Sequence, residues 1–332
     1  MAQPVAIVFV HGIHTFAPGY HAGMQAAIEA RLPKRLRDYV TFRSVFWAER
    51  VRQRQKEYLD AVAKKNLFPV TPYRSLVVQG LGDAAAYQKT KSFRNSSYYE
   101  IQADVRAVLE SLDAENLPNR PLIFIGHSLG CHIVSSFIWD VNTIKNWDET
   151  RLVQEGEEIR EFAVHLKNGS PFRRLDTLAG LVMMGSNMPL FTFTFGPGRI
   201  LPITSSRDPS DPPAFPGKDL PADMRSRARW LNYYSRNDLL GYPLKPLNDA
   251  YANEPLLDDI EVASEGWFLR GVGRLSQPLV AHQAHTGYWN NRRVVRGAAE
   301  LITSLATVGE PAPKRRFAFW RRPEEELAAA AS

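Results

Sequence analysis

The chain has 332 residues, of which 44% are hydrophobic and 23% charged, and its formal net charge is +6. This length is sufficient for a large domain with its own core, and the composition excludes disordered and fibrous proteins. A single cysteine, Cys131, excludes an internal disulfide framework, and no stretch approaches the roughly 20 apolar residues that a transmembrane helix requires.

Five apolar segments are predicted to form strands. Three are almost continuously apolar, which is typical of parallel strands buried on both faces: Val5–Val10, Leu122–Ile125 and Leu178–Met184. Val40–Trp47 and the aromatic-rich Trp230–Tyr234 are predicted to be two more. Helical periodicity follows in four segments: Ala48–Lys65, a helix that starts at a capping box of Ser97 and Glu100, Leu129–Asp140 and Val294–Leu305. This alternation indicates an α/β fold with a mainly parallel central sheet covered by helices on both faces.

Two long segments interrupt the alternation, at residues 147–172 and 191–225, and the second is rich in proline and serine. Long loops in a compact domain are usually functional or disordered, so we predict lid-like insertions here. Beyond Gly309 the sequence changes to a proline-containing, basic and alanine-rich composition. We therefore predict one domain over residues 1–309 and a C-terminal tail over residues 310–332.

The strand that ends at Ile125 leads into a G-x-S-x-G motif, and an amphipathic helix follows it. This context is typical of a nucleophile elbow, a sharp turn that presents the serine at the carboxyl end of the sheet. Glycines are needed there because any side chain would collide with neighbouring backbone. The helix N-terminus stabilises a developing oxyanion, and we expect the Leu129 N–H to be one donor. The residues of the motif are Gly126, His127, Ser128, Leu129 and Gly130.

A second motif, His11-Gly12, follows the first predicted strand. In folds with a nucleophile elbow, a loop at this place supplies the second oxyanion N–H. Gly12 allows the backbone to approach the substrate closely, and Ile13 is the expected donor, with His14 as the alternative. His11 is interpreted as a structural hydrogen-bonding residue, because a catalytic histidine follows the serine in this chain order.

The same chain order places an acid after the serine and before the histidine. Asp238 comes shortly after the predicted strand that ends at Tyr234, where the orienting acid is normally found, although a turn aspartate would look the same. Asp249, Asp258 and Asp259 are rivals on later loops, and none follows a predicted strand as clearly.

His282 and His285 are the candidate bases, and we favour His285, which lies directly before the predicted start of the final helix. An H-x-x-H spacing without a third ligand nearby is a poor zinc signature, so neither a metal nor another cofactor is predicted. In the predicted chemistry, His285 takes the proton of Ser128 and Asp238 holds the imidazole tautomer. Ser128 attacks an acyl carbonyl, and water hydrolyses the acyl-enzyme.

These segments resemble the α/β-hydrolase superfamily, and more narrowly a group of poorly characterised bacterial hydrolases with a G-H-S-L-G elbow. The resemblance runs from about Val5 to about Leu305. It implies the α/β-hydrolase fold without its first two strands, and lipase- or esterase-like activity on a small-molecule acyl ester. The shared motifs besides the elbow are Gly80–Tyr87, Gly185–Phe191, the stretch from Asn232 to Leu244, and His285–Trp289.

The acyl specificity remains open. Phenylalanines of the second insertion suit an apolar acyl pocket, although core packing explains them equally well: Phe191, Phe193, Phe195 and Phe215. A thioesterase, an amidase or an acyltransferase could use the same triad, because the fold does not determine the leaving group. A catalytically silent scaffold that binds a partner is the non-enzymatic alternative.

Basic residues are concentrated between Arg31 and Lys56 and in the tail from Lys314 to Arg322. No nucleic-acid-binding motif accompanies them, so a nucleic-acid partner is not predicted. The aromatic and basic tail could contact an anionic membrane peripherally, or it could dock on its own domain or on a second subunit. Because no basic segment precedes the first apolar run, we expect a cytoplasmic protein.

Overall fold

A six-stranded sheet forms the centre of the part of the chain that the structure describes. This structure is a computed structural model, and it describes residues 2–307 except 14, 16, 68, 70, 90–95, 118, 154, 194–195, 197–199, 207–210 and 264–276. The strands are β1 (Val5–Val10), β2 (Val40–Val45), β3 (Leu122–His127), β4 (Leu178–Met184), β5 (Arg229–Tyr234) and β6 (Leu257–Glu261).

Helices connect these strands. The longer ones are α1 (Ala22–Glu29), α2 (Ala48–Lys64), α3 (Pro72–Ala86), α4 (Ser97–Asp113), α5 (Leu129–Lys145), α7 (Glu157–Lys167), α12 (Gln277–Thr286) and α13 (Arg292–Ala306). The shorter ones are η1 (Lys34–Tyr39), α6 (Glu149–Val153), α8 (Met188–Thr192), α9 (Ala222–Arg227), η3 (Lys245–Leu247), α10 (Asp249–Ala252) and η4 (Gly287–Asn290).

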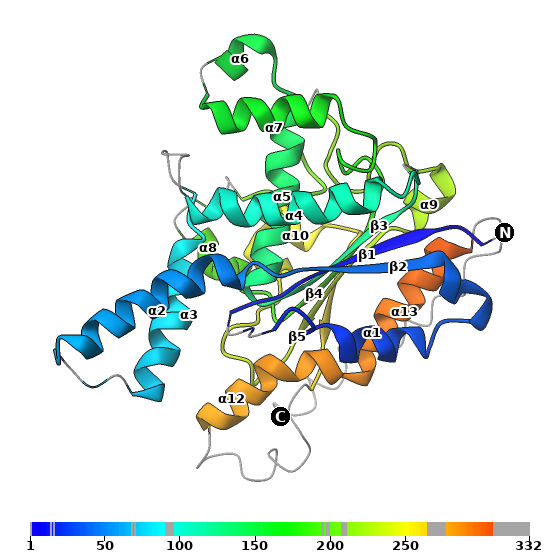
Figure 1. The fold of residues 1–332 in the computed structure, drawn as a ribbon. Coiled ribbons are helices and arrows are strands. Elements are labelled where there is room, and N and C mark those ends of the chain that lie inside the picture. The colour runs from blue at the N-terminus through cyan, green and yellow to red at the C-terminus, as the bar shows by residue number, and fades with distance from the viewer. Residues whose placement is uncertain are drawn as a thin grey trace.

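All neighbouring strands of the sheet are parallel, in the order β2-β1-β3-β4-β5-β6. The chain first moves outward from β1 to β2 and then returns to the other side of β1 with β3. From there the strands follow in sequence to β6. The carboxyl ends of β1 and β3 therefore lie side by side at the place where the direction of the winding changes, and α2 and α3 extend from this end of the sheet (Figure 1).

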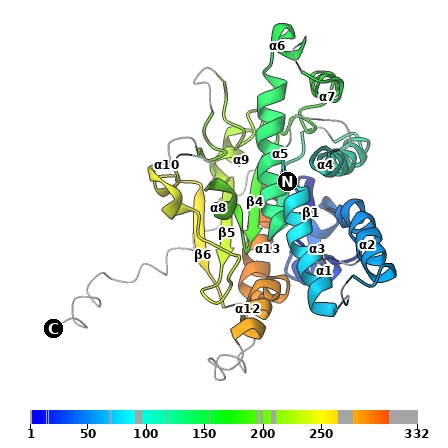
Figure 2. The ribbon, with the colours of Figure 1, turned by 90° about the vertical axis from the view of Figure 1, so that its left-hand side faces the viewer.

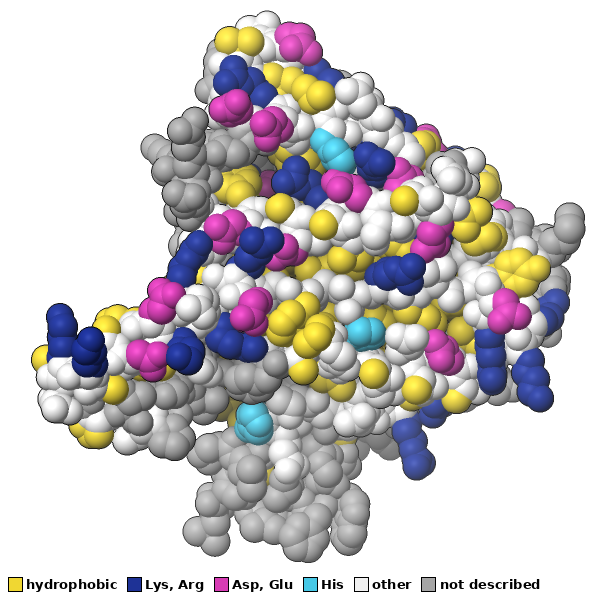
Figure 3. All heavy atoms as spheres, in the orientation of Figure 1, with side chains coloured by type: hydrophobic (Ala, Val, Ile, Leu, Met, Phe, Trp, Pro, Cys, Tyr) yellow, Lys and Arg dark blue, Asp and Glu magenta, His cyan; other side chains and the backbone are white. Residues whose placement is uncertain are grey.

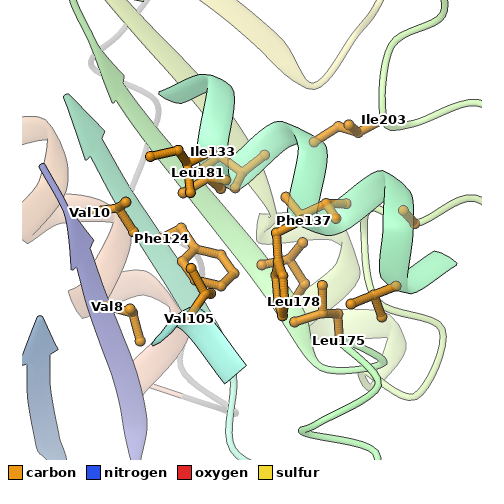
Figure 4. Packing of buried hydrophobic residues seen from close by; sticks show 14 of the residues in the cluster. Val8, Val10, Val105, Phe124, Ile133, Phe137, Leu175, Leu178, Leu181 and Ile203 are labelled. Carbon is orange, nitrogen blue, oxygen red and sulfur yellow. The ribbon is translucent and has the colours of Figure 1, made fainter. Parts of the chain in front are cut away.

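Helices cover both faces of the sheet, with α4 and α5 on one and α1 and α13 on the other (Figures 1 and 2). Each face has its own buried cluster, because successive side chains of a strand point in opposite directions. Val8 and Val10 of β1 belong to the cluster beneath α4 and α5, together with Phe124 and Phe137 (Figure 4). Phe9 belongs to the cluster beneath α1 and α13.

The predicted parallel sheet with helices on both faces is confirmed, and four of the five predicted strands begin at the expected residue. The structure adds β6, whose sequence Leu257–Glu261 contains three acidic residues and lacks a continuous apolar pattern. The predicted capping box is wrong. Ser96 occupies the N-cap of α4, and the Arg54 guanidinium instead binds the Ser97 hydroxyl at 2.7 Å and the Glu100 carboxylate at 3.1 Å.

Much of the two predicted insertions packs on the domain. Residues 147–172 contain α6 and α7, and α7 packs against α5. In the second insertion, Ile203, Phe215 and Leu220 are fully buried. Part of the second insertion therefore contributes apolar side chains to the core of the domain. The predicted C-terminal tail lies outside the described residues.

Charged side chains of both signs are interspersed over α2, α4 and α7 (Figure 3). In the basic region between Arg31 and Lys56, several cations are paired with carboxylates: Arg43 with Glu115, Arg50 with Asp104, Arg54 with Glu100, and Lys56 with Asp60. Within the described part of the chain, no helix is both long and apolar enough to cross a membrane.

The start of α5 lies so close to β1 that only glycine fits at position 130. A Cβ atom built on Gly130 would lie 2.2 Å from the carbonyl oxygen of Val10 and 2.7 Å from that of His11. We expect Gly130→Ala to lower the free energy of unfolding by about 3 kcal/mol, because backbone must move to relieve the overlap. Denaturant unfolding followed by circular dichroism measures the change.

Gly23 is the matched control, since a Cβ atom there would meet no atom within 4 Å. Gly23→Ala should leave the stability unchanged or raise it by up to about 1 kcal/mol, because alanine lowers the entropy of the unfolded chain. Equal stabilities of the two variants would contradict the close approach of α5 to β1.

Candidate active site

Ser128 lies in the turn between β3 and α5. Its backbone has φ 53° and ψ −124°, a left-handed conformation that residues other than glycine rarely adopt. The Ser128 N–H donates to the carbonyl oxygen of Met184 at 2.9 Å, which ties the turn to the end of β4. Strain of this kind persists only where the surrounding structure enforces it, and it is concentrated at functional sites. The neighbouring ends of β1 and β3 are also the switch point of the sheet, where ligands bind in open α/β folds.

Three glycines allow the backbone to close around this turn. A Cβ atom on Gly126 would lie 3.1 Å from the Cα atom of Cys131, and the contact of Gly130 with β1 is described above. A Cβ atom on Gly12 would lie 2.5 Å from the Cβ atom of Ser128 and 3.1 Å from its Oγ. The loop that follows β1 therefore passes directly against Ser128.

A chain of hydrogen bonds joins Ser128 to two residues that are far away in the sequence. The Ser128 Oγ lies 2.7 Å from Nε2 of His285. On the other side of the ring, Nδ1 of His285 lies 2.9 Å from Oδ1 and 3.0 Å from Oδ2 of Asp238. The three residues are nearly inaccessible to solvent, with 1%, 8% and 5% of their surface exposed in the order Ser128, His285, Asp238. The structure thus brings together the three residues that the sequence predicts as nucleophile, base and acid.

The Asp238 carboxylate has two further hydrogen-bond donors. The Leu240 N–H donates to Oδ1 at 2.9 Å, and the Tyr288 hydroxyl donates to Oδ2 at 2.8 Å. Burial alone would raise the pKa of Asp238, but the hydrogen bonds from His285, Leu240 and Tyr288 outweigh it and lower the pKa. Asp238 is therefore held in its ionised form as an acceptor for His285.

Sequence reasoning missed Tyr288. The only signal was the H-x-G-Y-W stretch, in which the tyrosine comes three residues after the histidine. Gly185 makes the contact possible, since a Cβ atom there would lie 2.8 Å from the Tyr288 ring and 2.9 Å from Oδ2 of Asp238. Gly185 has φ 58°, and a Cβ atom on Gly241 would lie 2.3 Å from the same carboxylate oxygen. Two glycine-containing loops thus enclose the carboxylate.

The position of His285 corrects one expectation. It lies in the last turn of α12, whereas the prediction placed it directly before the final helix. The short helix η4 intervenes, and α13 begins at Arg292 after an Asn291 side-chain cap. The alternative base, His282, is exposed one turn earlier on α12. The two histidines lie on the same helix, but His282 is exposed and His285 is buried. Of the two, only His285 contacts Ser128 in the described structure.

The rival aspartates have other surroundings. The Asp259 carboxylate accepts the N–H groups of Leu244 and Lys245 and the Asn232 amide, at 2.7–3.0 Å. Asp249 is the first residue of α10, and Asp258 is an exposed residue of β6. The Asp259 carboxylate thus holds a backbone turn, whereas Asp238 is the aspartate that contacts Nδ1 of His285 in the described structure.

His11 holds the loop that contains Gly12. Its Nδ1 donates to the Gly12 carbonyl at 2.7 Å, and its Nε2 accepts the Trp47 N–H at 3.2 Å. The imidazole also stacks on the Trp47 ring, with the centroids 4.8 Å apart. Burial lowers the pKa of His11 to about 4, so the ring is neutral at physiological pH. Both ring nitrogens are engaged by the backbone, as expected for a structural residue.

The two predicted oxyanion donors border Ser128. Leu129 is the first residue of α5, so its N–H has no acceptor within the helix. Ile13 follows Gly12 in the loop against Ser128, and its partly buried side chain packs on the core cluster beneath α5. His14, the alternative donor, lies outside the described residues.

His127, the remaining residue of the motif, ends β3 and is buried. Its Nε2 lies 2.7 Å from the backbone carbonyl oxygen of His285. Cys131 is buried within the core cluster, and its thiol lies 3.6 Å from the Met184 carbonyl oxygen. Burial raises the pKa of Cys131 to about 12.

Three phenylalanines of the second insertion are described, and each has different surroundings. Phe215 is buried in the core, whereas Phe193 is 77% exposed. Phe191 stacks on His132 of α5, with the ring centroids 4.2 Å apart, and Phe195 lies outside the described residues. Core packing therefore accounts for Phe215, but not for the exposed Phe193. In the described part of the chain, no group of three or more His, Cys, Asp or Glu side chains could hold a metal ion.

No protein-family model matches the sequence, and a comparison with curated proteins found no match. Among solved structures, a cutinase-like protein from Cryptococcus sp. aligns over 90% of this chain and 95% of its own, with 11% identity and a TM-score of 0.34. An iodinated complex of acetyl xylan esterase aligns over 92% of this chain and 100% of its own, with 13% identity and a TM-score of 0.34.

Tyr288→Phe tests the support of the Asp238 carboxylate. We expect the free energy of unfolding to fall by about 1.5–3 kcal/mol at neutral pH, because a hydrogen bond to a buried charge is lost. Since the pKa of Asp238 is lower in the folded state, its ionised form contributes stability above the unfolded pKa of about 4. That contribution is lost as the pH falls through the folded value, so the difference between the proteins should shrink in acid.

Denaturant unfolding over a pH series measures this difference, and the control is Tyr58→Phe at an exposed position of α2. The control should behave like the wild type at every pH. A Tyr288→Phe effect that stays constant down to the acid limit would show that the hydroxyl does not act through the carboxylate.

Proposed function

We propose that this protein is a serine hydrolase of the α/β-hydrolase fold that cleaves a carboxylic ester through an acyl-enzyme intermediate. The observation that carries the proposal is the continuous chain of hydrogen bonds from Ser128 through His285 to Asp238. Nucleophile, base and orienting acid are recognised by this geometry rather than by their sequence positions. The location of Ser128 in a strained turn at the switch point of the sheet supports the same assignment.

The reaction follows from the properties of the three groups. The Ser128 oxygen attacks the acyl carbonyl carbon while its proton passes to Nε2 of His285. The resulting imidazolium donates from Nδ1 to the Asp238 carboxylate, which stays ionised and stabilises the charge. His285 then gives its proton to the leaving alkoxide, and the ester bond breaks. In the second half, water attacks the acyl group, its proton goes to His285, and Ser128 is regenerated as the acid departs.

The negative charge on the carbonyl oxygen requires two donors. We assign these to the N–H groups of Leu129 and Ile13. The Leu129 N–H is one of the unpaired groups at the start of α5, where the helix dipole also favours an anion. The absence of a side chain at Gly12 supports the assignment of Ile13, because it lets the loop approach Ser128. Donors that are held in place before the charge develops contribute most to catalysis.

An ester is favoured over the other acyl substrates by the sequence resemblance rather than by the geometry, which suits thioesters and amides equally. The catalytically silent alternative is opposed by the backbone of Ser128. A left-handed conformation at a non-glycine residue costs about 1–3 kcal/mol, and Ser128 retains it together with the complete hydrogen-bonded chain. A scaffold would have no need for either feature.

Ser128→Ala should abolish covalent labelling by a fluorophosphonate probe and lower the turnover of a short p-nitrophenyl ester by about 10⁶-fold. The loss follows from removing the attacking oxygen. Gel fluorescence and absorbance assays measure the two effects. Ser135→Ala on the same helix is the control and should label normally. Labelling of the Ser128→Ala protein at the wild-type rate would overturn the assignment of the nucleophile.

His285→Ala should lower turnover about as much as Ser128→Ala, because members of a triad act as a unit. His282→Ala, one turn earlier on α12, is its matched control and should remain within about threefold of the wild type. If the two histidine variants exchanged ranks, His282 would be the base.

Asp238→Asn should lower turnover by about 10⁴-fold, because an amide favours the wrong imidazole tautomer. Asp258→Asn on the neighbouring strand β6 should have little effect, since Asp258 is exposed. Steady-state assays of the two purified proteins provide the comparison. A near-wild-type rate for Asp238→Asn would exclude Asp238 as the orienting acid.

A further inference from the structure

His127 contacts the catalytic histidine of the proposed triad from a side that the reaction does not use. Its Nε2 lies 2.7 Å from the backbone carbonyl oxygen of His285. Because a carbonyl oxygen can only accept, Nε2 of His127 must carry the proton and donate it. The contact joins residues 158 positions apart in the sequence, and it is buried.

The acceptor lies where a helix loses its internal donors. His285 belongs to the last turn of α12, which ends at Thr286. Carbonyl groups of a last helical turn have no partner within the helix and need another donor. The side chain of His127 supplies such a donor and connects the end of α12 to the end of β3.

The protonation state of His127 suits a permanent donor. Burial, and secondarily the neighbouring His285, lowers its pKa to about 3. The ring is therefore neutral throughout the neutral and alkaline range. A neutral imidazole has a single N–H, and the contact with the carbonyl assigns it to Nε2. The ring is also packed, with its centroid 5.0 Å from that of His285 and 5.4 Å from that of Trp289.

Two adjacent residues of the elbow thus contact the same histidine at both of its ends. Ser128 meets the imidazole at Nε2, and His127 meets the backbone carbonyl, each at 2.7 Å. We infer that His127 is a positioning residue for the proposed hydrolase reaction: its hydrogen bond to the His285 carbonyl keeps the imidazole within reach of the Ser128 hydroxyl. This inference rests on the proposed function. It adds a role for the residue that directly precedes the nucleophile.

The test compares His127→Gln with His127→Met. Glutamine and methionine have side chains of similar length, but only the glutamine amide can donate a hydrogen bond to the carbonyl. We expect His127→Met to lower kcat by about 10- to 100-fold with KM within about twofold, since a small misplacement of a catalytic group costs this much. His127→Gln should stay within about threefold of the wild type.

Fluorophosphonate labelling rates should fall in the same order, and thermal unfolding shows whether both variants are folded. If His127→Met does not fold, His127→Phe makes the same comparison, because it keeps a ring against Trp289 and lacks the donor. Equal activities of the donor and non-donor variants would overturn the inference, whether both are active or both inactive. If both variants are active, the hydrogen bond is dispensable. If both are inactive, His127 acts through its packing and not through the hydrogen bond.

A second readout does not depend on turnover. The Nδ1 proton of His285, shared with Asp238, should give a far-downfield proton resonance in the wild type that is missing in His285→Ala. We expect this resonance to persist in His127→Gln and to broaden or disappear in His127→Met. Its persistence in both variants would overturn the inference. Absence of labelling and hydrolysis in the wild type would contradict the proposed function. The resonance of His285 in the two His127 variants would still show whether His127 holds the imidazole.

Discussion

The contact between the start of α5 and the end of β1 determines how the site is assembled. The helix approaches the strand until the Gly130 Cα hydrogen faces the Val10 carbonyl, and a methyl group would not fit between them. This approach brings the turn at Ser128 against the loop that contains Gly12. It also places the first residue of α5, Leu129, directly after Ser128 at the start of the helix. A looser packing of α5 would move Ser128 away from the loop that contains Gly12.

On the other side of Ser128, the structure buries a polar chain that would be costly if any member lacked a partner. An ionised carboxylate in an apolar interior is unfavourable unless several donors surround it. Asp238 receives donors from His285, Leu240 and Tyr288, so its charge is retained. The second requirement is space, which Gly185 and Gly241 provide by having no side chains. The Asp238 carboxylate therefore needs both its hydrogen-bond donors and the two glycines that make room for it.

The sequence predicted the elements whose physical signal is local. β1, β3 and β4 are continuous apolar runs because both of their faces are buried, and the G-x-S-x-G turn has its own steric pattern. Contacts between segments that are far apart in the chain have no local sequence pattern. β6 contains three acidic residues and was missed, and the partners of Ser97 and Glu100 turned out to be a guanidinium on α2.

The site shows the same division. Motif context and chain order predicted Ser128, His285 and Asp238 as nucleophile, base and acid, and the structure places the three residues in one hydrogen-bonded chain. The contacts of Tyr288 and His127 depend on how α12 and η4 pack against the sheet, and no sequence periodicity indicates that packing. The phenylalanines of residues 191–225 illustrate the limit of composition, because one is in the core, one stacks on His132 and one is exposed.

The environment of Cys131 has a practical consequence. The chain has one cysteine, and its thiol is buried with a pKa raised to about 12. Only a thiolate reacts readily with maleimides and iodoacetamides, so we expect the folded protein to resist these reagents. A cysteine introduced on an exposed face would therefore be modified alone. Fluorophores or spin labels can be attached at chosen positions without replacing Cys131, which packs in the core three residues after Ser128.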